Sequence, residues 1–157
     1  LDKYNEFKYN DEDDLYLDLN LLLSVKYTEI KRIDKKTELD RKDQNKFKKS
    51  LLKMYDNKCI ISQNDCIDEL EAAHIVPVRQ NGSYNINNGL LLTSNLHKTF
   101  DKYYWSINPE SLKIECKNKF NIGSIKKYEN KIIDLDKNIT LLNNLKKHYN
   151  LFLEQTL

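Results

Sequence analysis

The sequence predicts an α+β fold built from small elements: a short β-hairpin followed by a helix, a second small hairpin, and helices on both flanks. Apolar residues recur at helical spacing in residues 40–55 and again near the carboxyl end, whereas short apolar runs bounded by polar turns lie between them. With 157 residues, the chain has room for one compact domain of modest core and an appended segment.

Composition argues against a membrane protein. The chain is 39% hydrophobic and 32% charged, and its mean hydropathy of -0.74 indicates a heavily solvated surface. The most apolar stretch, residues 15–25, is interrupted by Asp18 and Asn20, and it is shorter than the roughly 18 residues that a spanning helix needs. We therefore expect no membrane span.

The three cysteines, Cys59, Cys66 and Cys116, form no CxxC pair. A zinc site that combines them with His148 is an alternative, but the separations are irregular. Mostly buried thiols in a reducing cytoplasm are the favoured interpretation.

Charge is unevenly distributed along the chain. Residues 1–20 hold seven acids and two bases, whereas residues 21–53 hold eleven bases and five acids. A local surplus of lysine suits a polyanion such as DNA, although such a run is also typical of a solvated helix face.

The elements before the central loop are a helix and a predicted hairpin. The helix covers residues 40–55, begins near Asp40, and places apolar residues on one side and lysines on the other. Its apolar side holds Phe47, Leu51, Leu52 and Tyr55. Residues 59–61 and 70–78 are two short apolar runs, and they predict a β-hairpin whose second arm carries His74.

After a loop over residues 79–88, the sequence "LLLTSNLHKTFDKYYW" changes from an apolar start to helical spacing, with Thr93 or Ser94 as the N-cap. Residues 106–118 predict a second hairpin that turns at Asn108 and Pro109. A closing helix has an apolar stripe of Leu141, Leu142, Leu145, Tyr149 and Leu153.

Four residues stand out for their chemistry. His74 follows Ala73 on the predicted strand, Asn88 lies fourteen residues later, and His97 lies nine residues after that. Asp101 follows His97 by four residues, so both side chains lie on one helix face and can hold a divalent ion together. Taken singly, His74 also suits a structural role and Asn88 a turn. His97 and Asp101 also suit a pair on the surface of a helix.

Taken together, the motifs "AAHIVP", "NNGLLL" and "LHKTFD" resemble the HNH endonucleases, whose active site is a ββα-metal finger, and specifically the branch found in restriction enzymes. The flanking segments "DRKDQNKFKKSLLKMYDNKCIIS" and "NLKKHYNLFLEQ" resemble the helices that precede and close the finger in that branch. The resemblance covers residues 40–157 and implies an HNH nuclease domain there, with the ββα-metal core at about residues 58–105.

The resemblance implies a role for each motif residue. His74 stands at the position of the general base, and Asn88 at the position where a side-chain amide braces the loop and fixes the direction of that histidine. His97 stands at a metal-ligand position, and Asp101 matches a further ligand of some members. The implied cofactor is a divalent ion, Mg²⁺ first, with Mn²⁺, Ni²⁺ or Zn²⁺ as alternatives.

One departure concerns the residue before the general base. Many HNH enzymes have a metal-binding aspartate or histidine there, and this chain has Ala73. Glu71 is a weak substitute, because on a regular strand it points to the opposite side from His74. Metal binding is therefore expected to rest on His97 and Asp101 together with phosphate and water.

Basic residues near these motifs are candidate DNA contacts. Arg79 follows the proline of "AAHIVP", and Lys98 is next to His97. Lys49 and Lys53 lie on the basic face of the helix at residues 40–55, together with Lys46 and Lys48. Solvated surface residues are the alternative for each of them.

The sequence thus indicates a cytoplasmic, metal-dependent HNH endonuclease that cuts double-stranded DNA in a restriction system, with no membrane partner. A nuclease toxin domain and an inactive DNA-binding HNH module are the alternatives. Since the chain starts at Leu1 rather than methionine, we expect it to be a fragment. Residues 1–39, which include the acidic stretch, are interpreted as the edge of a missing recognition domain or as an oligomerisation element, and a homodimer is left open.

Overall fold

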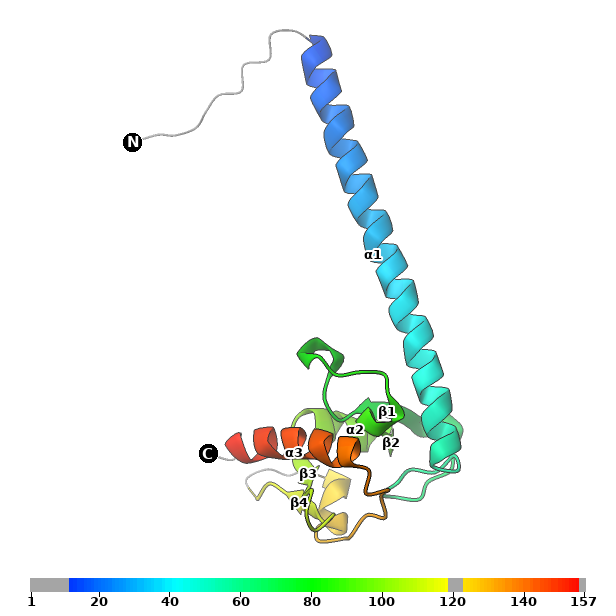
Figure 1. The fold of residues 1–157 in the computed structure, drawn as a ribbon, viewed down its shortest axis with the longest axis vertical. Coiled ribbons are helices and arrows are strands. Elements are labelled where there is room, and N and C mark those ends of the chain that lie inside the picture. Colours follow the sequence, from blue (N-terminus) through cyan, green and yellow to red (C-terminus); the bar gives the residue numbers. More distant parts are fainter. Residues whose placement is uncertain (1–11, 119–122, 156–157) are drawn as a thin grey trace, which may run out of the picture. The chain divides into compact units, whose positions relative to one another are not determined.

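The computed structural model describes residues 12–118 and 123–155. By their internal contacts, the residues divide into two units, Leu1–Lys42 and Asp43–Leu157. The long helix α1 (Glu12–Met54) contributes to both units (Figure 1). The predicted helix start near Asp40 is therefore wrong. Residues 12–42 contain no glycine or proline, so nothing in their backbone chemistry ends the helix there.

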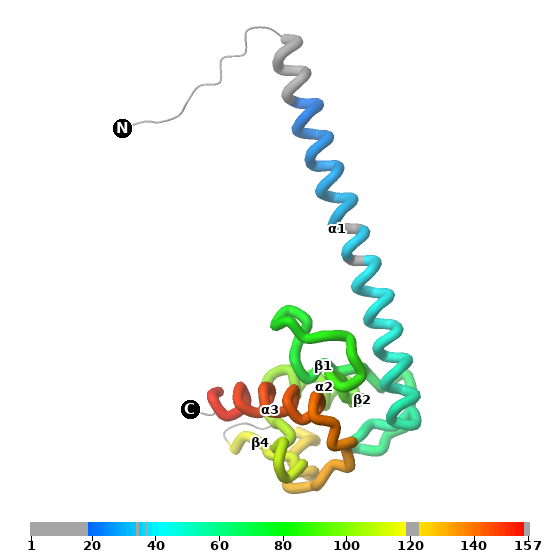
Figure 2. The backbone as a smooth tube through the Cα atoms, viewed as in Figure 1, coloured from blue at the N-terminus to red at the C-terminus, as the bar shows by residue number. Residues whose placement is uncertain are grey.

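The second unit is built around a ββα arrangement. Strands β1 (Leu70–His74) and β2 (Gly89–Thr93) pair antiparallel, with His74 opposite Gly89, and helix α2 (Ser94–Asp101) follows β2 without a break. Figure 2 shows the chain leaving β1 through a loop and returning as β2. The two small hairpins and flanking helices confirm the predicted α+β class.

The predicted pairing of residues 59–61 with residues 70–78 is wrong. Residues 59–61 form a turn instead of a strand, in which the amide of Cys59 donates to the carbonyl of Asn64 and that of Gln63 to the carbonyl of Cys59. One hydrogen bond, from the Ile60 amide to Leu91 O at 3.0 Å, ties this turn to β2. The partner of β1 is the later strand β2, which is buried along its whole length.

The second hairpin matches the prediction. Strands β3 (Trp105–Ile107) and β4 (Ile114–Cys116) pair antiparallel, and Oδ1 of Asn108 accepts bonds from the amides of Glu110 and Ser111 in the turn between them. Helix α3 (Ile139–Glu154) packs against β3. The described residues also contain the 3₁₀ turns η1 (Ile67–Glu69), η2 (Val78–Gln80), η3 (Ile86–Asn88) and η4 (Gly123–Tyr128).

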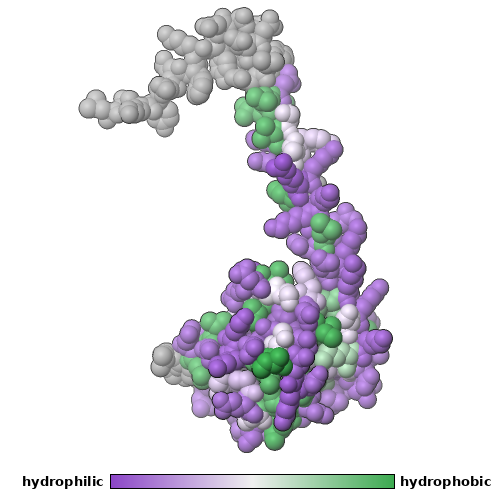
Figure 3. Space-filling view, in the orientation of Figure 1, coloured by the Kyte–Doolittle hydropathy of each residue, from purple (hydrophilic) through white to green (hydrophobic). Residues whose placement is uncertain are grey.

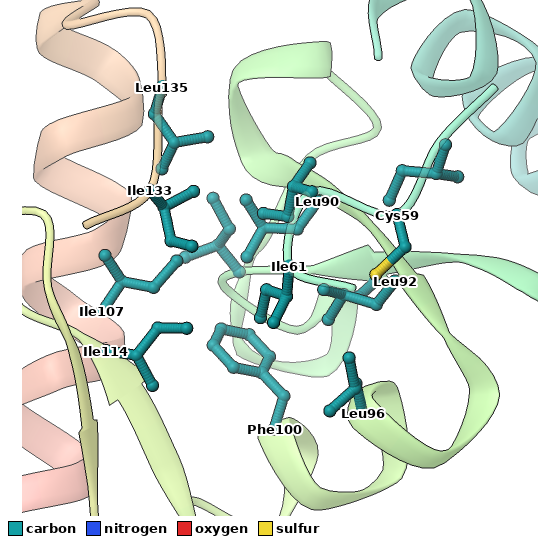
Figure 4. Close-up of a cluster of buried hydrophobic side chains, with 14 of the residues drawn as sticks. Cys59, Ile61, Leu90, Leu92, Leu96, Phe100, Ile107, Ile114, Ile133 and Leu135 are labelled. Carbon is teal, nitrogen blue, oxygen red and sulfur yellow. The ribbon is translucent and has the colours of Figure 1, made fainter. Parts of the chain in front are cut away.

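One apolar core joins both hairpins, α2 and α3 (Figure 4). Leu141 and Leu145 are fully buried, as the predicted stripe of α3 requires. The prediction that Leu153 belongs to this buried stripe is wrong, because its side chain is 46% exposed. Phe152 and His148 take the inward positions in the same turns, because they follow Leu145 at helical spacing.

The cysteines and the helices bear on the expectations of buried thiols and of no membrane span. All three cysteines are free, and Cys59 and Cys116 are buried whereas Cys66 is exposed. Within residues 12–118 and 123–155, no helix is both long enough and apolar enough to cross a bilayer.

Candidate active site

A cavity of about 350 Å³ opens beside the ββα arrangement and collects polar side chains from five parts of the second unit. The polar side chains that line it are Gln44 of α1, His74 of β1, Arg79 of the loop, His97 and Asp101 of α2, and His148 of α3. Three of the four residues singled out for their chemistry, His74, His97 and Asp101, therefore face one space.

His74 ends β1 and is held between aromatic rings. Its imidazole stacks on Phe47 at a centroid distance of 4.3 Å and meets the edge of Tyr84 at 5.1 Å. Among the described residues, no hydrogen-bond partner reaches its buried Nε2. Burial lowers the pKa of His74, and the nearby His97 lowers it further. The ring is therefore neutral at neutral pH and keeps a lone pair for a proton.

Asn88 does not line the cavity but clamps the loop that follows His74. Its Oδ1 accepts from the Val76 amide, and its Nδ2 donates to the carbonyls of Val76 and Ser83, each at 2.9 Å. Its main-chain carbonyl accepts from the Ile75 amide at 2.9 Å. With 2% of its surface exposed, Asn88 ties the backbone just after His74 to the start of β2.

Gly89 brings α1 close to this point. A Cβ atom on Gly89 would lie 2.5 Å from Cζ of Phe47 and 2.6 Å from Cδ1 of Leu51. Only a residue without a side chain lets Phe47 reach the ring of His74 here. The glycine of "NNGLLL" therefore serves packing between the helix and the hairpin.

His97 lies between two carboxylates. Its Nδ1 is 2.7 Å from Oε2 of Glu71, and Oε1 of Glu71 accepts from the Ser94 hydroxyl at 2.7 Å. Burial works to raise the pKa of Glu71, but the hydrogen bonds from Ser94 and His97 outweigh it and hold that pKa below its usual value. The carboxylate of Glu71 is thus ionised and fixes the orientation of the His97 ring.

The other nitrogen of His97 points toward Asp101, with Nε2 and Oδ2 separated by 3.4 Å. Burial raises the pKa of Asp101, and the positive charges at His97 and Arg79 offset this only in part. A proton on Nε2 joins this pair when His97 is charged, and a metal cation can take the place of that proton between Nε2 and Oδ2.

The spacing fits such a cation with two protein ligands. Nitrogen and oxygen ligands lie about 2.0–2.2 Å from a small divalent ion, which places adjacent ligands roughly 3 Å apart. Within the described part of the chain, no three His, Cys, Asp or Glu side chains form a metal-binding group. His97 and Asp101 can hold an ion whose remaining ligands are substrate oxygens and water.

The predicted basic contacts divide into two groups. Arg79 lines the cavity, and its charge acts on Asp101. Lys98 is exposed on α2 and close enough to Glu71 to lower its pKa. Lys49 and Lys53 are exposed on α1 and do not line the cavity.

Sequence reasoning did not place Gln44 or His148 at this site, and it considered His148 only as a zinc ligand together with the cysteines. Gln44 precedes Phe47 by three residues, so the helical spacing of residues 40–55 already placed it on the inward face. His148 stacks flat on Phe100 at 3.7 Å, and its ring nitrogens lie 2.9 Å from the Ser106 hydroxyl and 3.2 Å from Phe100 O. Burial lowers the pKa of His148 to about 4.

Residues 59–108 match a family described as HNH endonuclease. The matched segment contains β1, β2, α2 and β3, and with them His74, Asn88, His97 and Asp101. No curated protein has a significant match to this chain.

Proposed function

We propose, from the match of residues 59–108 to the HNH endonuclease family, that the protein is a metal-dependent endonuclease that hydrolyses phosphodiester bonds in double-stranded DNA. The observation that carries this proposal is the shared cavity, where a neutral histidine faces a histidine–aspartate pair and an arginine. Phosphodiester hydrolysis needs these components: a base for the attacking water and positive charge at the phosphate.

His74 is the proposed general base. Its lowered pKa leaves the imidazole unprotonated at neutral pH, and its stacking on Phe47 restricts the ring. A positioned base near its working pH accelerates such a step by about 10²–10⁴-fold. Asn88 acts through His74, since its clamp on Val76 fixes the backbone from which that side chain projects.

His97 and Asp101 are the proposed metal ligands, and Glu71 orients His97 through Nδ1. A divalent ion held there, Mg²⁺ first and Mn²⁺, Ni²⁺ or Zn²⁺ as alternatives, would neutralise charge on the scissile phosphate and on the leaving 3′-oxygen. Ala73 contributes no ligand, because it has no donor atom and is fully buried.

The basic residues are proposed to hold the DNA backbone. Arg79 lines the cavity, so its guanidinium is placed for a phosphate next to the reacting one. Lys98, Lys49 and Lys53 are exposed and suit phosphates further along the duplex.

A restriction system in the cytoplasm is the proposed setting. The motifs "AAHIVP", "NNGLLL" and "LHKTFD" support the restriction branch, and three free thiols suit a reducing compartment. A homodimer, which would present two such sites to the two DNA strands, is also part of the proposal.

Incubation of the purified protein with supercoiled plasmid tests this function. We expect nicking or linearisation with Mg²⁺ or Mn²⁺, complete loss with EDTA, and product ends that carry a 5′-phosphate. Methylated and unmethylated plasmids test the restriction setting, because a restriction enzyme discriminates between them. DNA binding without cleavage under every metal condition would contradict the proposal and indicate an inactive binding module.

A further inference from the structure

Helix α3 buries a histidine among apolar side chains. Polar side chains cover much of the visible face of the second unit in Figure 3, whereas apolar ones gather in its core. His148 is an exception, because only 3% of its surface is exposed. Burial lowers its pKa to about 4, so the ring is neutral at neutral pH and has one N–H donor and one lone-pair acceptor. Leaving either group unpaired in the core would destabilise the fold.

Both ring nitrogens of His148 have partners, and these partners define the tautomer. Nε2 lies 3.2 Å from Phe100 O, and a carbonyl oxygen only accepts, so the hydrogen is on Nε2. Nδ1 lies 2.9 Å from the hydroxyl of the fully buried Ser106, which therefore donates to it. Because both nitrogens are occupied, His148 is neither a metal ligand nor a base at the cavity that it lines.

The carbonyl that His148 binds lies at the end of α2, next to a proposed metal ligand. Phe100 precedes Asp101, the last residue of the helix. The terminal carbonyls of a helix lack partners within the helix, and Phe100 O accepts from the Tyr103 amide at 2.8 Å as well as from His148. These two bonds hold the backbone that carries the Asp101 side chain.

The turn that ends α2 has a strained conformation. Tyr103 has a φ of 53°, in the left-handed region that bulky L-residues disfavour. The imidazole of His148 stacks on the Phe100 ring at a centroid distance of 3.7 Å and contacts the Tyr103 ring at 4.8 Å. One side chain of α3 thus contacts residues on both sides of Asp101. It stabilises a turn that α2, with eight residues, is too short to hold alone.

The position of this turn matters for the proposed metal site. Asp101 faces the cavity, with its Oδ2 3.4 Å from Nε2 of His97. Metal–ligand distances tolerate only about 0.2 Å of variation, so a shift of the α2 end would move the carboxylate out of reach of an ion that His97 binds. Packing alone does not require an imidazole at residue 148, because a phenyl ring fills similar space without binding the Phe100 carbonyl.

We propose that His148 is a positioning residue, which binds the Phe100 carbonyl and the turn after it and thereby places the Asp101 carboxylate for the metal ion. The inference rests on the proposed function, because it concerns the metal site of that same reaction.

Nuclear magnetic resonance of the metal-free full chain tests the hydrogen bond itself. The chain has three histidines, so substitution of His74 and of His97 assigns the ring nitrogen signals, and those of His148 follow by elimination. We expect His148 to carry its hydrogen on Nε2. A hydrogen on Nδ1 would overturn the proposal whatever the activity of the protein. This measurement needs no variant of His148, so it decides the question even if such variants fail to fold.

Binding of Mn²⁺, read from the broadening of the His97 ring signals, tests the consequence without DNA or cleavage. His148→Phe keeps a ring for stacking and loses the donor, whereas His148→Gln keeps a donor at the position of Nε2. We expect His148→Phe to need about 10-fold more Mn²⁺ for half-maximal broadening, and His148→Gln to need as much as the unmodified chain. Leu145→Ala is the control, since it opens a cavity beside the same helix and should lower the melting temperature without changing the Mn²⁺ requirement.

The outcomes separate the positioning role from the proposed function. Equal Mn²⁺ requirements for His148→Phe and the unmodified chain would overturn the positioning role and leave the proposed function standing. An equal loss in Leu145→Ala would also overturn it, because general destabilisation would then explain the effect. An unmodified chain whose His97 signals do not respond to Mn²⁺ would contradict the proposed metal site, and the positioning role with it.

Discussion

Replacing Asn88 with alanine removes the clamp behind the proposed general base. The side chain makes three hydrogen bonds of 2.9 Å, two with the Val76 backbone and one with Ser83 O, and it is 2% exposed. At about 1 kcal/mol for each bond, the loss is about 3 kcal/mol of unfolding free energy. For a chain of this size, that lowers the melting temperature by roughly 6–12 °C.

Thermal unfolding of Asn88→Ala checks this value, and Asn144→Ala is the control. Asn144 donates a single bond, to Asn87 O at 3.1 Å, so its loss should lower the melting temperature about one third as much. Below both melting temperatures, Asn88→Ala should still bind DNA but cleave it at least 10-fold more slowly, because His74 is no longer fixed. Equal melting temperatures for the two variants, or an unchanged cleavage rate, would refute the clamp.

Three further predictions concern the same unit. Glu71→Gln should raise the metal concentration for half-maximal cleavage by about 10–100-fold, because the carboxylate that orients a metal-binding imidazole is lost; the exposed Glu110→Gln variant should leave it unchanged. Because the pKa of His148 falls from 6.5 to about 4 on folding, unfolding binds a proton between these values. Stability should therefore be lost as the pH falls from 6.5 toward 4, by about 3 kcal/mol from this group, and urea unfolding of His148→Gln should show a shallower pH slope. Gly89→Ala should destabilise the unit by about 1–3 kcal/mol in the same measurement, because its Cβ would lie 2.5 Å from Phe47 Cζ; an unchanged midpoint would show that the contact relaxes freely.

The strand pairing shows what local sequence patterns could and could not predict. The apolar run at residues 70–78 predicts a strand, and β1 occupies its first five residues, Leu70–His74. Its partner was placed at residues 59–61, because that run is nearer in the sequence. The actual partner, β2, is buried at all five positions, so it lacks the alternation that marks a half-exposed strand.

The orientation of Glu71 was predicted correctly, but its contact with His97 was not predicted. Strand alternation placed Glu71 away from His74, and Glu71 does not line the cavity. Yet an imidazole has two nitrogens, and His97 contacts Glu71 through Nδ1 while Nε2 points toward Asp101. The position of α2 against β1 decides this contact, and residue spacing within one element carries no such information.

The extent of α1 was open to prediction, since residues 12–42 lack helix-breaking residues. An amphipathic face does not reveal the full length of α1. The apolar residues at 19–33 are exposed and belong to the first unit, whereas those at 47–51 are buried in the second unit.

Parallel cleavage and binding assays on His74→Ala test the central claim most directly. The account predicts that the variant binds a DNA duplex with the affinity of the unmodified protein, and that its single-turnover cleavage rate with Mg²⁺ or Mn²⁺ falls by about 10²-fold or more. A His74→Ala variant that folds, binds DNA and cleaves it at the unmodified rate would contradict the assignment of this histidine as the base, and with it the proposed reaction at this cavity.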